Sequence, residues 1–142
     1  MLHLTLEDQL FISQPKQLGT HSSQHENLAV VFEDDGETGY FYAIDTQQDE
    51  AIVDCLHIYN AASVEQKETA RQLQICWSED GYFAILLIND YPHAAFDFKR
   101  LIAYNHNQFP QPAITSLWSH KLITDELIKQ WLTDAENDCT RQ

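Results

Sequence analysis

The chain has 142 residues and a mass of 16.4 kDa, and its 22 acidic side chains against 8 lysines and arginines give a formal net charge of −14. We expect a single domain over residues 1–142, with residues 1–27 as a less defined N-terminal segment, and the 44% of hydrophobic residues exclude general disorder. The charge argues against nucleic acid and membrane partners, because phosphates and anionic lipids are bound through clustered lysine and arginine.

Residues 28–44 predict a β-hairpin. The segments Leu28–Glu33 and Gly39–Ile44 are rich in β-branched and aromatic residues, and the dipeptide Asp35-Gly36 between them tolerates the positive φ angles of a tight turn. The preceding residues 14–27 are polar and predict a loop, which leaves the first dozen residues as a separate strand or helix.

Residues 49–59 predict a helix. Their apolar side chains recur at spacings of three and four, which places them on one helical face, and two acidic residues stand at the favourable N-terminal end. The apolar positions are Ala51, Ile52, Cys55, Leu56 and Tyr59.

A second hairpin is predicted over residues 73–88. Residues 73–77 alternate, Asp80-Gly81 marks the turn, and residues 82–88 are almost continuously apolar, as in a central strand. Residues 89–92 then predict a turn and Ala94–Phe98 a further strand, which residues 101–104 extend or follow.

The last predicted element is a helix that starts after Thr124. A threonine is a good N-cap, acidic residues follow it, and Ile123 and Ile128 are placed to contact each other across the cap. The apolar face consists of Leu127, Ile128, Trp131, Leu132 and Ala135. The order of elements predicts an α+β fold, with an antiparallel sheet of hairpins packed against one or two helices.

The three cysteines, Cys55, Cys76 and Cys139, are too widely spaced for a disulfide framework or a zinc site. Cys76 lies in an apolar run and is predicted to be a small buried side chain. The first eight residues lack the features of a signal peptide, and no apolar run approaches the length of a membrane helix. We therefore expect a cytoplasmic protein.

Residues 33–37 are the most acidic run in the chain, and three interpretations of them are open. A divalent metal site would need oxygen ligands at alternating positions, whereas these acids are consecutive. The run is otherwise a solvated hairpin tip or a recognition surface. Between Gln17 and Gln66 the chain has ten acids and no lysine or arginine, which is typical of a solubilising surface or of a surface that meets a basic partner.

No catalytic, metal or cofactor motif appears, so we expect a protein that is not an enzyme and binds neither a metal nor a cofactor. If residues 49–59 are helical, Cys55 and His57 diverge and form no nucleophile–base pair. Two alternatives remain open. One is a small regulatory or ligand-binding domain whose pocket is lined by Tyr40, Tyr42, Trp77 and His57, and the other is a hydrolase with an unfamiliar site.

Four segments carry a resemblance to a known family. Residues 33–43, 56–60, 77–81 and 87–94 resemble a family of small uncharacterised bacterial proteins, and the match extends over about residues 28–98. Proteins of this kind are similar to immunity proteins of contact-dependent growth inhibition. That similarity implies a Whirly-like fold without a basic nucleic-acid-binding motif, and a toxin partner that resembles EndoU-type ribonucleases. It implies no catalytic residue.

The residues and the resemblance lead to one hypothesis: the chain is an immunity protein that occludes the active site of a basic nuclease toxin. A nuclease must be basic to hold phosphates, so an inhibitor that fills its cleft is expected to be acidic. The predicted partner contacts are Glu33, Asp34, Asp35, Glu37, Asp45, Asp49 and Glu50. The oligomeric state is left open.

Overall fold

The computed structural model describes residues 2–139, with side chains described as far as Thr133. The described part consists mainly of β-strands, together with one α-helix and a single 3-10 turn. A six-stranded sheet has the order β1-β6-β7-β8-β9-β10, and a four-stranded sheet has the order β2-β3-β4-β5. The strands are β1 (Leu2–Leu10), β2 (Lys16–His21), β3 (Leu28–Asp34), β4 (Thr38–Asp45), β5 (Ile52–Asn60), β6 (Arg71–Ser78), β7 (Phe83–Ile88), β8 (Tyr91–Asp97), β9 (Ile102–Asn105) and β10 (Ser119–Leu122). The helix is α1 (Asp125–Cys139), and the 3-10 turn is η1 (Ala61–Ser63).

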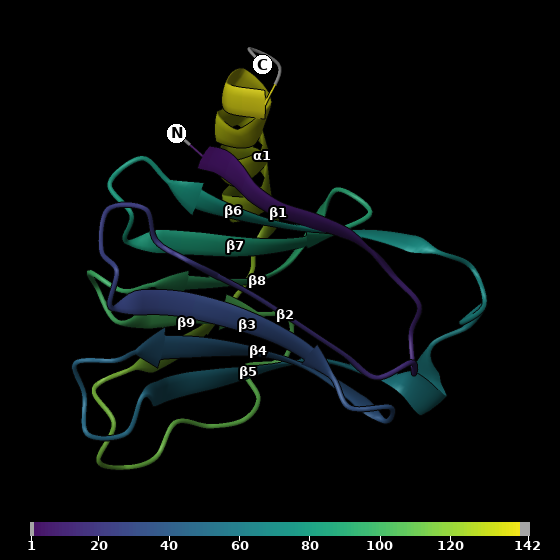
Figure 1. Ribbon diagram of the computed structural model, residues 1–142, viewed down its shortest axis with the longest axis horizontal. Helices are drawn as coiled ribbons and strands as arrows, with labels where there is room; N and C mark the ends of the chain where they lie inside the picture. Colours follow the sequence, from purple (N-terminus) through teal and green to yellow (C-terminus); the bar gives the residue numbers. More distant parts are fainter. Residues whose placement is uncertain (1, 140–142) are drawn as a thin grey trace.

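The two sheets pack face to face around one apolar core (Figure 1). Alternate residues of β3 and β4 point into this core, among them Val30, Phe32 and Phe41, and each is fully buried. The opposite sheet contributes side chains such as Phe96, which stacks on Phe41 with ring centroids 5.1 Å apart. The period of two in the sequence therefore decides which side chains enter the core.

The helix α1 covers the outer face of the six-stranded sheet. A second apolar cluster joins Trp131 of α1 to Phe83 and Tyr104, with ring centroids 5.4 Å apart in both pairs. The N-terminus of the helix is capped as predicted, because the backbone N–H of Leu127 donates to Thr124 Oγ1 at 3.2 Å. Ile123 and Ile128 both belong to the cluster, whereas the side chain of Ala135 lies outside the described ones.

Both predicted hairpins are confirmed, as β3–β4 and β6–β7, and the turn glycines Gly36 and Gly81 have φ angles of 101° and 75°. Residues 91–97 form β8, and β9 is a separate strand. Cys76 is buried in the second cluster, as predicted. The α+β expectation holds in its coarser form: the fold is mostly β, with antiparallel sheets and one described α-helix, except that β10 pairs with β9 in parallel.

The predicted helix over residues 49–59 is wrong, because residues 52–60 form the strand β5. The apolar positions of this segment fit a helical spacing and an alternating one about equally well. The β-branched residues Ile52, Val53 and Ile58 favour the strand, and pairing with β4 supplies its backbone hydrogen bonds. The loop prediction for residues 14–27 also missed β2, and β10 was not predicted.

The contact of α1 with the sheet gives a stability prediction. Trp131→Ala removes a buried aromatic side chain and is expected to lower the free energy of unfolding by about 3 kcal/mol. Urea unfolding measures the change, and Thr133→Ala on the exposed side of the same helix is the control. Equal stabilities of the two variants would show that the helix contributes little to the folded domain.

Candidate binding groove

The structure separates the predicted partner contacts into two groups. Glu33, Asp34, Asp35 and Glu37 lie at the tip of the β3–β4 hairpin, whereas Asp45, Asp49 and Glu50 lie at the opposite end of β4, at the loop to β5. A strand of eight residues spans about 25 Å. The two acidic groups are therefore not one continuous cluster.

Asp34 holds the hairpin in place. Its side chain is almost fully buried, and its carboxylate accepts hydrogen bonds from the backbone N–H groups of Ser13 (2.9 Å) and Gly36 (2.8 Å) and from the Tyr59 hydroxyl (2.6 Å). Burial and this carboxylate raise the pKa of Tyr59. Asp34 consequently offers almost no surface to a partner. Its hydrogen bonds instead stabilise the hairpin and its contact with the neighbouring segments.

The other acids at the hairpin tip differ in their exposure. Asp35 accepts the backbone N–H groups of Glu37 and Thr38, both at 2.9 Å, and these bonds lower the pKa of its carboxyl group. Glu33 accepts a hydrogen bond from the Tyr42 hydroxyl at 3.3 Å. Glu37 is exposed. The tip therefore combines a turn-stabilising acid with carboxylates that remain accessible.

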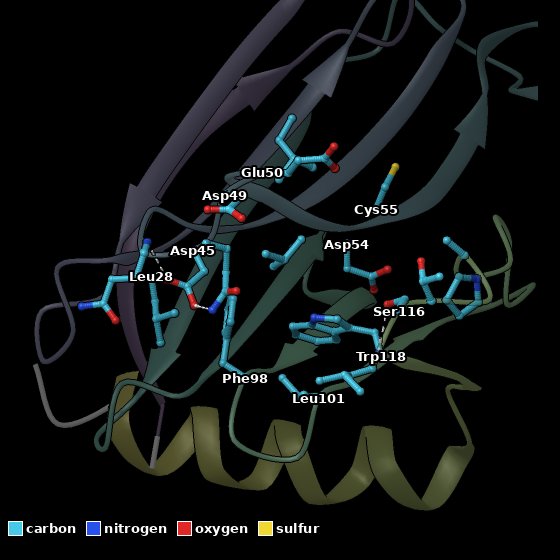
Figure 2. A pocket seen from close by; sticks show the side chains of 18 of the residues that line it. Leu28, Asp45, Asp49, Glu50, Asp54, Cys55, Phe98, Leu101, Ser116 and Trp118 are labelled. Carbon is cyan, nitrogen blue, oxygen red and sulfur yellow. Dashed lines mark hydrogen bonds between the residues drawn. The ribbon is translucent and has the colours of Figure 1, made fainter.

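The second acidic group borders a groove of about 1280 Å³ at the end of the sandwich (Figure 2). One wall is formed by the β4–β5 loop and the start of β5, and the facing wall by residues 110–118. Trp118, Phe98 and Leu101 supply apolar side chains from the six-stranded sheet and its connections. The groove thus joins an apolar lining to an acidic border.

Among the described residues that line this groove, none is a lysine or an arginine, whereas four carry carboxylates. They are Asp45, Asp49, Glu50 and Asp54. Asp45 accepts a hydrogen bond from Asn27 Nδ2 at 2.8 Å, which fixes it against the neighbouring loop, and Asp49 and Glu50 are exposed. The carboxylates of Asp45, Asp49 and Glu50 therefore give the groove an acidic border.

Asp54 forms a buried ion pair with His120. The Asp54 carboxylate oxygens lie 2.8 and 2.9 Å from His120 Nε2, and the two side chains are 6% and 2% exposed. On the other side of the ring, Nδ1 faces the Gln108 carbonyl at 3.4 Å, so both ring nitrogens point at acceptors. Burial lowers the pKa of His120, but Asp54 outweighs this effect and raises it overall.

The side-chain amide of Asn105 joins β5 to the segment after β9. Asn105 is buried, and its Nδ2 donates to the carbonyl oxygens of His57 and Phe109, each at 2.9 Å, and to Asn107 Oδ1. The backbone N–H of His57 also donates to the Phe109 carbonyl. Together with the Asp54–His120 pair, these bonds fix the wall of the groove against β5.

Cys55 and His57 do not form a catalytic pair, although the predicted reason was wrong. Both lie on a strand, where residues i and i+2 point to the same face. Burial and Asp54 raise the pKa of the Cys55 thiol to about 11, which disfavours a thiolate. The His57 ring is occupied, because Nδ1 accepts from Asn107 Nδ2 at 2.9 Å and Nε2 donates to Asn60 Oδ1 at 3.0 Å.

The pocket predicted for a ligand-binding domain is not formed by its four residues. Trp77 is buried in the core, whereas Tyr40, Tyr42 and His57 lie on the outer face of the four-stranded sheet. Within the described residues, no group of three or more His, Cys, Asp or Glu side chains is arranged to hold a metal ion. No helix in this part of the chain is long and apolar enough to cross a membrane.

Sequence reasoning missed the groove because its walls come from segments that were predicted differently or left unassigned. The acids Asp45, Asp49 and Glu50 were identified, but Asp54 was placed on a helix and Trp118 in no element. The sequence signal for this wall is the segment around residues 109–112, whose two prolines interrupt a strand. From the sequence alone, this segment is interpreted only as a loop.

Comparison with known proteins identifies relatives. The family model described as "Uncharacterized protein conserved in bacteria (DUF2251)" matches residues 10–132. An "Uncharacterized protein" of Haemophilus influenzae is 59% identical over 133 residues, which is 93% of this chain and 83% of that protein. A search of the solved structures found no match. The match to a bacterial family agrees with the resemblance seen in the sequence.

The buried ion pair predicts a pH dependence of stability. Because the pKa of His120 is raised in the folded state, the stabilisation by the pair is complete below the unfolded value of about 6.5 and is lost as the pH rises through the folded value. Asp54→Asn is expected to lower the free energy of unfolding by about 3 kcal/mol at pH 6 and to flatten its decrease at higher pH. Urea unfolding between pH 6 and 9 measures both effects.

Asp49→Asn is the matched control for that experiment, since the residue borders the same groove but is exposed. It should shift stability by less than about 0.5 kcal/mol at every pH. An unaltered pH slope in Asp54→Asn would mean that another group produces the dependence.

Asp34→Ala gives a second prediction, because it leaves the buried partners of the carboxylate without an acceptor. We expect a loss of about 3 kcal/mol in the free energy of unfolding. Glu37→Ala, at the exposed tip of the same hairpin, should change it by less than about 0.5 kcal/mol. Comparable unfolding midpoints for the two variants would contradict a structural role for Asp34.

Proposed function

The chain belongs to the DUF2251 family of bacterial proteins, and we propose that it is an immunity protein that binds and occludes the active site of a basic nuclease toxin. It acts in the cytoplasm by binding alone, without a catalytic step or cofactor. The observation that carries this proposal is the groove of Figure 2, in which the charged lining residues other than histidine are all acidic and border an apolar floor.

The charge of the groove suits a nuclease as the target. A nuclease holds phosphates with lysine and arginine side chains, and an inhibitor gains both association rate and specificity by presenting carboxylates to them. Arginine also carries an apolar stem and a planar head, which match a lining that has both aromatic rings and carboxylates. Trp118 supplies an aromatic ring to this groove, and Asp49 and Glu50 supply exposed carboxylates (Figure 2).

Exposed apolar side chains beside the groove favour a protein as its occupant. Leu117 on one wall is 82% exposed and Ile52 on the opposite wall is 57% exposed, and Ile114, which is close to Leu117 in sequence but does not line the groove, is 102% exposed. Their contact with solvent is unfavourable unless a partner covers them. The volume of about 1280 Å³ also exceeds the 300–1,000 Å³ that is usual for a small-molecule site.

The proposal extends to the fold. The two antiparallel sheets with a helix outside are compatible with the Whirly-like architecture that the resemblance to immunity proteins implies. The strongly acidic character agrees with the absence of a basic nucleic-acid-binding motif in such proteins. An experimental structure of the complex would test this relation together with the interface.

The small ligand-binding domain is the second candidate, and the groove itself is the observation that favours it. In that case a small cation would saturate the groove and no protein partner would be needed. Titration with spermidine, followed by the indole N–H signals of the three tryptophans in NMR spectra, separates the candidates. Saturable binding at micromolar concentration favours the ligand-binding domain, and its absence favours a protein partner.

The function is tested by reading the gene beside this one, where the toxin of an immunity protein is expected, and by purifying the toxin domain it encodes as a catalytically inactive variant. The double variant Asp49→Lys, Glu50→Lys is expected to lower the association rate constant at least about tenfold at low salt and to weaken its salt dependence. In a growth assay with the active toxin, the wild-type chain should protect cells and the double variant should protect them poorly.

Glu68→Lys is the control for general charge effects, because it changes an exposed acid in the segment before β6, outside the groove and the outer sheet surface. It should reduce the association rate constant less than the groove variant does. The proposal fails if the wild-type chain neither binds the neighbouring toxin domain nor protects cells against it.

A further inference from the structure

The outer face of the four-stranded sheet carries a cluster of apolar and aromatic side chains, next to outward polar residues such as Glu33. Its central side chains are Val31, Tyr40, Tyr42, Ile44, Cys55 and His57, which are all partly exposed. We refer to these six residues as the outer face. In an antiparallel sheet with one side in the core, the other side normally carries polar residues. This face therefore departs from the pattern.

Cross-strand pairing brings the six residues together. Tyr42 lies between Val31 of β3 and Cys55 of β5, and Tyr40 pairs with His57. The rings of Tyr40 and Tyr42 are 6.0 Å apart, and the His57 ring is 6.1 Å from Tyr40. Adjacent aromatic side chains of this kind are the residues that most often dominate the energy of protein interfaces.

No described helix packs on the outer face, and the segment after β9 reaches only its edge, where Asn107 and Phe109 contact the His57 ring. The helix α1 packs on the other sheet, where it buries the corresponding apolar residues around Trp131. The fold thus treats its two outer surfaces differently, since one is completed by a helix and the other is left to solvent.

Carboxylates border the outer face at both ends. Glu33 and Glu37 lie toward the hairpin tip, and Asp49 and Glu50 lie at the β4–β5 loop. Lys16 at the start of β2 is turned away, because its ammonium group contacts Asp8 at 3.2 Å and the Gln9 carbonyl at 2.7 Å on β1. The arrangement is an apolar centre with a charged rim, and the rim is negative.

The size of the face indicates that it is one part of a larger interface. Four strands about 4.8 Å apart and seven residues long cover about 400 Å² in projection, whereas a standard interface buries about 800 Å² on each partner. Ile52 at the start of β5 and Cys55 both line the groove, so the groove and the outer face are continuous. The groove therefore adds to the area that a partner on the outer face could contact.

The acidic rim indicates what kind of partner can bind the outer face. Two copies of this chain, each with a net charge of −14, would bring their acidic rims against each other, so self-association through this face is disfavoured. We propose that the outer face is the second half of the surface that binds the basic toxin, with the tyrosines as its energetic centre. This inference rests on the proposed function and adds a separate binding surface to it.

The test uses Tyr42→Ala and Tyr40→Ala with the inactive toxin domain encoded beside the gene. Each variant is expected to raise the dissociation rate constant, by about 30-fold for Tyr42→Ala, with little change in the salt dependence of association. Tyr91→Ala is the matched control, since Tyr91 is a tyrosine 45% exposed on the opposite sheet. It should change the dissociation rate constant less than threefold.

A second measurement does not depend on the variants being folded. Hydroxyl-radical footprinting of the wild-type complex should protect Tyr40 and Tyr42 and leave Tyr91 reactive. If Asp49→Lys, Glu50→Lys weakens binding while both outer-face tyrosines remain reactive, this inference is overturned and the proposed function stands.

Two further outcomes also overturn the inference. Sedimentation of the chain alone as a dimer that Tyr42→Ala dissociates would assign the face to a second copy. Failure of the wild-type chain to bind the toxin domain would remove the proposed function and this surface with it.

Discussion

The contact between β5 and the segment that follows β9 is the constraint on which the groove depends. Asn105 donates to carbonyl groups on both sides of this contact, and Asp54 and His120 form an ion pair a few residues away. An amide and an ion pair buried this deeply are stable only when every polar atom has a partner. The groove wall formed by residues 110–118 is therefore held at both ends, by Asn105 and the Phe109 carbonyl at one and by β10 at the other. A preformed wall reduces the entropy that binding costs.

The distribution of charge follows from this construction. Carboxylates that serve the fold are saturated with hydrogen bonds from the chain itself, as Asp34 is at the hairpin. Those at the groove border, Asp49 and Glu50, are exposed and have no ion-pair partner among the described side chains. Unrelieved like charge destabilises the folded state, so its retention at one place needs a reason other than stability. The proposed binding to a basic protein would supply that reason.

Much of the fold could be predicted from the sequence where one local signal dominated. The dipeptides Asp35-Gly36 and Asp80-Gly81 located both hairpins, and Thr124 located the start of α1. The segment 49–59 was mispredicted because its apolar positions satisfy a helical and an alternating period together, and only pairing with β4 selects the strand. The site was harder to predict, since Asp54 and His120 are 66 residues apart in the sequence. The residues around each of them give no indication that the two side chains form a pair. Long-range pairs of this kind are fixed by topology rather than by propensity.

The mispredicted strand also changes the functional argument. On a helix, Asp54, Cys55 and His57 would point in three directions, and the acids before them would be a helix N-terminus. On β5, Asp54 turns toward the groove and its ion pair, while Cys55 and His57 turn outward beside Tyr42 and Tyr40. One strand thus contributes to both binding surfaces through its alternation. A partner that fills the groove must pass Ile52 and Cys55, which lie where the two surfaces meet. If the proposal holds, the acidic groove and the aromatic face form one interface, in which charge guides association and apolar contact sets its lifetime.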